Sequence, residues 1–269
     1  MDSNLIFYGV ASIFYLFVGL KIVVMSKKND VGLPIGVLVI AVLGVVNHFW
    51  VLQSDIFIAP GTIQLGWGSA LSAICFFSTL ILLFGAIYSR ADTLFGIILL
   101  ISALGVWLPE WLSNGNNILL QASSALKIHI AVAWLADSFV LMSVVQAIHM
   151  FFLERQLQKQ KPSLVKAAKI ESISVTKLPM MGQIHYQIVV ATFISLILML
   201  LTGILLWSKS SIVTGDLSHQ MILSGFSCGL LAIWLCGRKF LNLSMQCLRA
   251  LFWLAVCFQI ASFCINKIC

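Results

Sequence analysis

The sequence predicts an all-α fold: a polytopic membrane protein with about eight transmembrane helices and both termini on the outer side. Three observations predict it, namely the composition, the length of the apolar stretches and the distribution of the basic residues. Of the 269 residues, 61% are hydrophobic and only 9% are charged, whereas soluble domains carry about 25% charged residues. This composition excludes both a disordered chain and an ordinary soluble domain.

Eight stretches are apolar over the length needed to cross the hydrocarbon core, which takes about 20 helical residues. No basic residue precedes the first stretch, which does not fit a cleaved signal peptide. The seventh is the shortest, and Arg249 lies inside the eighth. Little sequence remains for a soluble domain, so residues 1–269 are predicted to form a single transmembrane helical domain. The expected spans are 5–25, 31–53, 67–88, 93–112, 128–152, 185–207, 219–236 and 241–264.

Polar connections separate these spans, and all but one are short. The exception is 153–184, which is polar, basic and carries Pro162 and Pro179. It divides the chain into two groups of four spans, and we expect it to be a basic cytoplasmic loop. The shorter connections are 26–30, 54–66, 89–92, 113–127 and 208–218.

The basic residues set the predicted orientation. With eight spans and an outer N-terminus, thirteen of the sixteen Lys and Arg residues fall on the cytoplasmic side. A cytoplasmic excess of basic residues is the positive-inside rule. The net charge of +7 is therefore a topology signal, and no basic patch interleaved with aromatic residues indicates nucleic acid. The outer side keeps Lys127, Lys209 and Lys267.

Three of the five histidines lie at similar depth in the predicted outer half of the bilayer. His48 lies near the outer end of the second span, while His129 and His219 open the fifth and seventh spans from outside. Imidazole is the commonest side-chain ligand of metals and a regular axial ligand of haem iron. Two of these histidines on facing helices would clamp a haem, with His129 and His219 as candidate iron ligands. Each histidine alone also fits a half-solvated role at the membrane interface.

Asp137, two helical turns after His129, is also costly to place inside a membrane span. A carboxylate inside a span costs a few kcal/mol unless it is protonated, paired or hydrated. Asp137 is therefore expected to orient a ligand, to pair with a base, to line a polar cavity, or to bond a neighbouring helix as the acid. A divalent-metal site is an open alternative, because Asp216 precedes His219 by three residues and Glu110 ends the fourth span.

Motifs of catalysis are missing from the sequence. The seven cysteines form no C-x-x-C pair and lie mainly inside spans, so no thiol chemistry is assigned to them. No G-x-x-x-x-G-K-[ST] or G-x-G-x-x-G indicates a nucleotide, and no G-x-S-x-G elbow indicates a serine nucleophile. We expect that the chain is not an enzyme.

Four segments carry a family resemblance, in order along the chain. They are "NHFWVL" (47–52), "IHIAVAWLADSFVLMSVVQAIHMFFLERQLQ" (128–158), "LPMMGQIHYQIVVATFISLILMLLTGILLW" (178–207) and "DLSHQMILSGFSCGLLAIWLCGR" (216–238). Together they resemble the cytochrome c assembly protein superfamily, in its branch of HemX-like and YpjD-like inner membrane proteins, relatives of CcsA and CcmC. In the 128–158 segment, a His-Ile pair begins the helix and a basic segment follows it, as in that family.

The resemblance implies an eight-helix protein of the bacterial inner membrane that binds or passes haem during cytochrome c maturation. The haem would be b-type, held stably or in transit, with His48, His129 and His219 as candidate ligands. Other membrane-bound maturation components are implied as partners. The chain lacks the tryptophan-rich outer motif of the haem-delivering members, Asp137 stands where relatives usually carry tyrosine, and "FLNLSMQCLRA" (240–250) replaces a Gly-Trp-Arg-Gly segment.

Three functions are therefore open. The first is haem binding or transit in the outer half of the helix bundle. The second is a non-catalytic regulatory or scaffold role, in which a cytoplasmic partner contacts 153–184. The third is transport of a small ion or divalent metal past Asp137 and the outer histidines, which requires a second intramembrane charge such as Arg249.

Overall fold

The computed structural model describes most of the chain, and the described residues group into two compact units. The units are Met1–Ser124 and Ala125–Cys269, and each is considered by itself, so the expected single domain stays a prediction. Eight helices of the described chain are long and apolar enough to cross a membrane, which confirms a helical, multi-pass architecture. The described residues are 3–28, 34–57, 62–88, 93–112, 118–121, 123–159, 164–209, 215–241 and 243–265.

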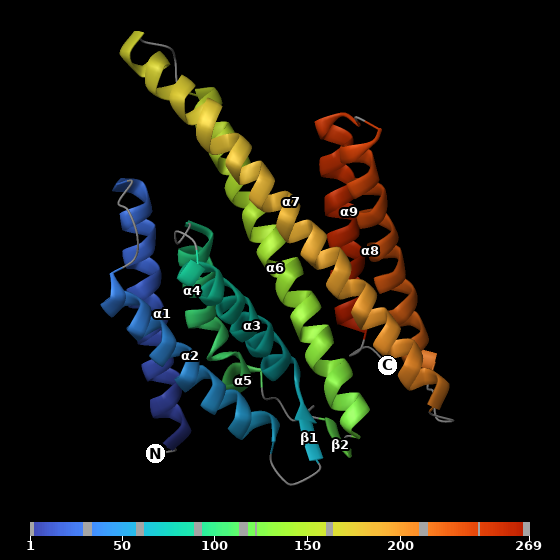
Figure 1. Cartoon of the computed structure of the whole chain (residues 1–269). Helices are drawn as coiled ribbons and strands as arrows, with labels where there is room; N and C mark the ends of the chain where they lie inside the picture. The colour runs from blue at the N-terminus through green and yellow to red at the C-terminus, as the bar shows by residue number, and fades with distance from the viewer. Residues whose placement is uncertain are drawn as a thin grey trace. The chain divides into compact units, whose positions relative to one another are not determined.

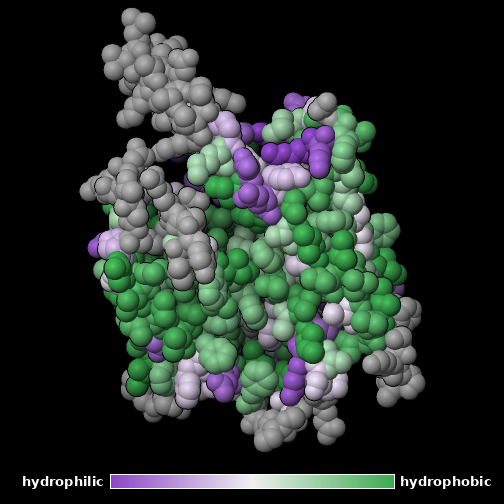
Figure 2. Space-filling model, in the orientation of Figure 1, coloured by the Kyte–Doolittle hydropathy of each residue, from purple (hydrophilic) through white to green (hydrophobic). Residues whose placement is uncertain are grey.

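The surface of the helices has the pattern expected of a chain in contact with lipid. Figure 2 shows hydrophobic residues over the middle of the helices and hydrophilic residues gathered near their ends. Large apolar side chains such as Ile13, Val46, Ile204 and Phe226 are exposed by about half or more of their area. Apolar side chains facing outward along a span match the hydrocarbon core.

The first unit is built on the packing of its first helix against its second and fourth helices (Figure 1). The backbones of the first and fourth helices come close together at Gly19 and Gly96. A Cβ at Gly19 would lie 3.0 Å from the Gly96 carbonyl oxygen, so a larger residue would not fit easily there. Tyr15, Phe95 and Leu99 are fully or nearly fully buried in this core. The helices are α1 (Ser3–Lys28), α2 (Ile35–Ile56), α3 (Trp67–Tyr88), α4 (Thr93–Gly105) and α5 (Leu108–Trp111).

The fourth predicted span, 93–112, is broken into α4 and α5. Pro109 has no N–H, and its ring would clash with the carbonyl of Gly105 in a continuous helix. The chain therefore leaves the helix at Val106 and Trp107 and begins a new turn at Leu108. This turn packs on the start of α3, where Gly68 leaves room for the backbone of Leu108 and Pro109.

Two short strands, which the sequence analysis did not predict, lie within the connections 54–66 and 113–127. Strand β1 (Thr62–Leu65) pairs antiparallel with β2 (Ile118–Gln121), with Thr62 opposite Gln121 and Leu65 opposite Ile118. The pairing is visible in Figure 1. It ties together the two connections that are expected on the outer side, at the end of α2 and after α5.

The second unit contains four long helices, of which α8 and α9 pack side by side along their lengths (Figure 1). Its buried core includes Ala136, Val189, Leu196, Trp234 and Phe252. Each helix contributes to this core, so the unit has one continuous apolar interior. The helices are α6 (Ser124–Lys159), α7 (Leu164–Lys209), α8 (Gly215–Lys239) and α9 (Met245–Ile265).

The stretch 153–184, expected as a cytoplasmic loop between spans, is largely helical in the structure. Helix α6 continues to Lys159 and α7 begins at Leu164. The 46 residues of α7 extend over about 70 Å at 1.5 Å per residue, far more than the hydrocarbon core of about 30 Å. The length of an apolar stretch predicts only the part of a helix that lies in lipid, so it does not predict the polar extension. Pro179 lies inside α7 without ending the helix.

Arg249, the charge inside the eighth predicted span, lies one turn into α9 and pairs with Glu154 near the end of α6 at 2.5 Å. About half of the Arg249 side chain is exposed. The pair therefore joins the start of α9 to the end of α6.

Candidate functional site

His129 lies near the start of α6 and makes a hydrogen bond to α7. Its Nδ1 lies 2.9 Å from Thr202 Oγ1. The Thr202 hydroxyl donates to the carbonyls of Leu198 and Met199, at 3.0 and 2.9 Å. If the hydroxyl proton stays within α7, the oxygen accepts from Nδ1–H of His129. The imidazole then presents the lone pair of Nε2, the tautomer that ligates metals.

A glycine makes room for this imidazole. A Cβ at Gly203 would lie 3.3 Å from His129 Cε1 and 3.9 Å from Met221 Sδ. The His129 ring and the Met221 thioether therefore flank the same point of α7, from α6 and from α8. His219 lies two residues before Met221, and its side chain is exposed. The second unit thus brings two of the three predicted histidines to the same end of its helices.

His48 has a different environment. Its side chain is fully buried in the first unit. Nδ1 lies 3.2 Å from the Tyr15 hydroxyl, Nε2 lies 2.9 Å from Ser72 Oγ, and the ring meets Phe76 edge-on. Both ring nitrogens are engaged, so His48 would ligate iron only after losing one of these bonds. It also belongs to the other unit from His129 and His219.

Asp137 is partly buried in α6 and accepts a hydrogen bond from α9. Gln259 Nε2 donates to Asp137 Oδ1 at 2.9 Å. A bond to a neighbouring helix was one of the roles open to Asp137 from the sequence, and Gln259 was not identified as its partner. A lone glutamine within the apolar stretch of α9 was the available signal, because an amide inside a span also needs a polar partner.

His185 is a buried histidine that sequence reasoning left without a role. It lies on α7, is 8% exposed and meets Trp234 and Phe252 edge-on, with ring centroids 5.9 and 5.1 Å away. Its Nδ1 has no hydrogen-bond partner among the described residues. His149 is partly buried in α6. Both histidines lie toward the opposite end of these helices from His129.

A compact cluster of classical metal ligands is missing from the described part of the chain. No group of three or more His, Cys, Asp or Glu side chains in it lies close enough to hold a metal ion. Glu110 is exposed on α5, and the Asp216 side chain lies outside the described residues. The divalent-metal alternative therefore gains no support from these residues.

Comparisons of this chain with protein-family models, with curated proteins and with solved structures find no match.

Proposed function

We propose that this chain is a multi-pass protein of the bacterial inner membrane, of the cytochrome c assembly type, that binds or passes haem. Both termini are proposed to lie on the outer side, as the distribution of basic residues indicates. The haem ligands are proposed to be His129 and His219, on α6 and α8 of the second unit. The protein binds haem in this proposal and catalyses no reaction of its own.

The hydrogen bond between His129 and Thr202 is the observation that carries the proposal. In the proposed tautomer, Nδ1–H of His129 donates to Thr202, and the Nε2 lone pair is left for iron. Metal-ligating histidines typically donate their other N–H in this way, which fixes the ring and raises its basicity. A haem held by His129 and His219 would supply a redox-active iron. Gly203 lets the His129 ring pack closely against α7, and Met221 adds a soft apolar surface.

The test is the visible absorption spectrum of the protein purified in mild detergent, oxidised and then reduced with dithionite. Two histidine ligands give a sharp low-spin haem spectrum in the reduced protein. No haem in the purified protein, and none after reconstitution with hemin, would contradict the proposal.

The second ligand is identified by comparing His219→Ala with His48→Gln. We expect His219→Ala to lose the low-spin spectrum, because one axial ligand is removed. We expect His48→Gln to keep it, because an amide at this position still bonds Tyr15 and Ser72 and the proposed haem lies elsewhere. The opposite pattern, with His48→Gln losing haem and His219→Ala keeping it, would move the site to the first unit.

A scaffold role is the second candidate, and the length of α6 and α7 favours it. The apolar part of α7 begins at Pro179, so the helix from Leu164 to that point lies beyond the span. A helical extension offers a partner a firmer surface than a loop does, because less conformational entropy is lost on binding. The partner is proposed to be cytoplasmic.

Deletion of 160–178 separates the two candidates. If the extension binds a partner, the deletion should abolish recovery of the protein in a complex while leaving membrane insertion and the haem spectrum unchanged. The measurement is cross-linking in membranes followed by size analysis of the solubilised protein. Unchanged cross-linked species would count against the scaffold role, and loss of haem would show that the extension supports the haem site.

A further inference from the structure

Arg238 lies in the last turn of α8, and its guanidinium group is held against α7. Its Nη2 donates to the Gly182 carbonyl at 3.3 Å. The guanidinium also lies over two aromatic rings, 4.9 Å from the Tyr186 centroid and 5.5 Å from the Trp234 centroid. Cation–π contacts and a hydrogen bond together favour one position of this group. The Arg238 side chain is nevertheless exposed, so the positioned charge is accessible from outside the second unit.

The rings of Tyr186 and Trp234 form the support of this guanidinium, which we call the aromatic platform. They stack on each other with centroids 6.2 Å apart and an interplanar angle of 27°. Trp234 is 4% exposed, and His185 meets its ring edge-on at 5.9 Å. The platform is therefore part of the packed interface between α7 and α8, which gives the guanidinium a fixed surface to rest on.

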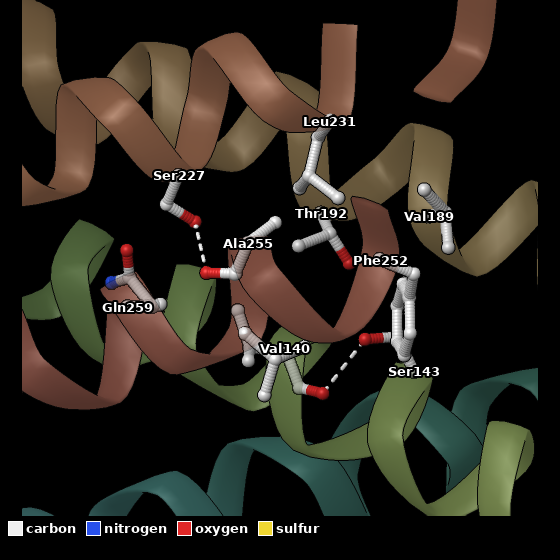
Figure 3. Close-up of a pocket in the computed structure, with 10 residues that line it drawn as sticks. Val140, Ser143, Val189, Thr192, Ser227, Leu231, Phe252, Ala255 and Gln259 are labelled. Carbon is white, nitrogen blue, oxygen red and sulfur yellow. Dashed lines mark hydrogen bonds between the residues drawn. The ribbon is translucent and has the colours of Figure 1, made fainter. Parts of the chain in front are cut away.

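The interior of the second unit beneath the aromatic platform is mainly apolar. One turn further along α7 and α8, Figure 3 shows Val189, Leu231 and Phe252 among the side chains that line a small cavity. Burying an anion among such side chains is costly. An anionic ligand of Arg238 is therefore expected on the exposed side of the platform and not within the core.

The other arginines at this end of the second unit are held differently. Arg249 is paired with Glu154. Arg155 lies over a single ring, that of Phe151, at 4.5 Å. Among the described residues, no carboxylate forms an ion pair with Arg238. An arginine that only extends into water needs no support from two helices, and ordering its side chain costs up to about 2 kcal/mol. The ordered, uncompensated charge of Arg238 suits an anionic ligand.

We propose that Arg238, on the aromatic platform, binds the phosphate group of an anionic phospholipid. Arg238 lies at the end of the apolar stretch of α8, and Tyr186 lies near the start of that of α7, the level at which long basic side chains reach the lipid headgroups. A guanidinium donates two parallel N–H bonds to phosphate, and the bond to Gly182 leaves most of its N–H groups for this. Anionic lipids attract basic residues on the cytoplasmic side, which is the side proposed for this end.

The lipid site is separate from the proposed haem site. Arg238 lies at the opposite end of α8 from His219, and no described interaction joins it to His129. Lipid binding is measured on the lipids themselves, so the haem spectrum should be unchanged in variants of Arg238. Failure of one proposal therefore leaves the other to be judged on its own readout.

The experiment measures the phospholipids that the full-length protein retains in mild detergent, by native mass spectrometry. Phosphatidylglycerol and phosphatidylcholine with the same acyl chains are offered in equal amounts, and we expect phosphatidylglycerol to be retained preferentially. Arg238→Gln should weaken its affinity about tenfold or more, because charge-assisted bonds to phosphate are lost. Arg238→Lys should weaken it too, because lysine keeps the charge but lacks the planar donor pair.

Arg155→Gln is the matched control, because Arg155 is also an exposed arginine over an aromatic ring but does not lie on the platform. It should keep the preference for phosphatidylglycerol. Equal retention of the two lipids would overturn the proposal. An equal loss in Arg155→Gln and Arg238→Gln, or an unchanged affinity in Arg238→Lys, would overturn it as well, since charge alone would then explain the binding. Displacement of the lipid by an equal concentration of glycerol phosphate would exclude the lipid as the ligand and assign the site to a soluble phosphate ester.

Discussion

Replacing His129 with alanine is expected to abolish haem binding. The substitution removes the imidazole that packs beside Gly203, and the methyl group left behind cannot ligate iron. The measurement is the haem content and reduced spectrum of the purified protein. Since the His129 side chain is only partly buried, the substitution should leave the fold intact, which the helical circular dichroism checks.

Thr202 gives this prediction a sharper form. Thr202→Val removes the oxygen that accepts from Nδ1–H of His129 at 2.9 Å and keeps nearly the same shape. Loss of such an orienting partner typically weakens metal binding by about 10–100-fold. Thr202→Ser is the matched control, because it keeps the hydroxyl and should retain haem. A normal spectrum in His129→Ala would remove His129 as a ligand, whatever the Thr202 variants do.

Replacing Gly68 with alanine is expected to destabilise the first unit strongly. A Cβ at Gly68 would overlap the Leu108 carbonyl oxygen and would lie 2.7 Å from Pro109 Cα. These are backbone atoms, which cannot move aside as the end of a flexible side chain can. Overpacking of this kind costs about 1–3 kcal/mol or more, which exceeds the gain of about 1 kcal/mol from a better helix former.

Gly85→Ala is the matched control for this effect. Gly85 lies on the same helix, α3, and a Cβ there would meet no atom within 4 Å. This variant should be as stable as the unmodified protein, or more stable by up to about 1 kcal/mol. Thermal unfolding in detergent, followed by tryptophan fluorescence, compares the two variants. Equal melting temperatures for Gly68→Ala and Gly85→Ala would show that the α5 backbone can shift to admit a Cβ at little energetic cost, contrary to this prediction.

The sequence predicted the membrane-crossing helices well, because an apolar run of span length has few alternatives in lipid. It did not predict where α6 and α7 end, since a polar helix beyond the bilayer carries no hydropathy signal. Strands β1 and β2 were missed for another reason. Each has four residues, and the pairing joins segments more than fifty positions apart, so neither segment shows the pattern of a hairpin by itself.

The site was predictable only in part. Intramembrane histidines and carboxylates stand out in an apolar sequence, so His48, His129 and Asp137 were recognised as residues that need polar surroundings. Their partners Thr202 and Gln259 were not recognised, because helix neighbours depend on packing that a single sequence does not reveal. For the same reason, depth alone grouped His48 with His129, although the two belong to separate compact units.

The close approach of Gly19 and Gly96 has a consequence for the synthesis of this protein. Helix α1 is translated before α4, on which its tight contact lies, so two intervening spans are made before that face of α1 is covered. Helices α8 and α9, by contrast, are neighbours in the chain and can pair as soon as both are inserted. Because exposed packing surface in a nascent chain invites misassembly, the face of α1 that packs on α4 is open to wrong contacts in the interval between the translation of the two helices.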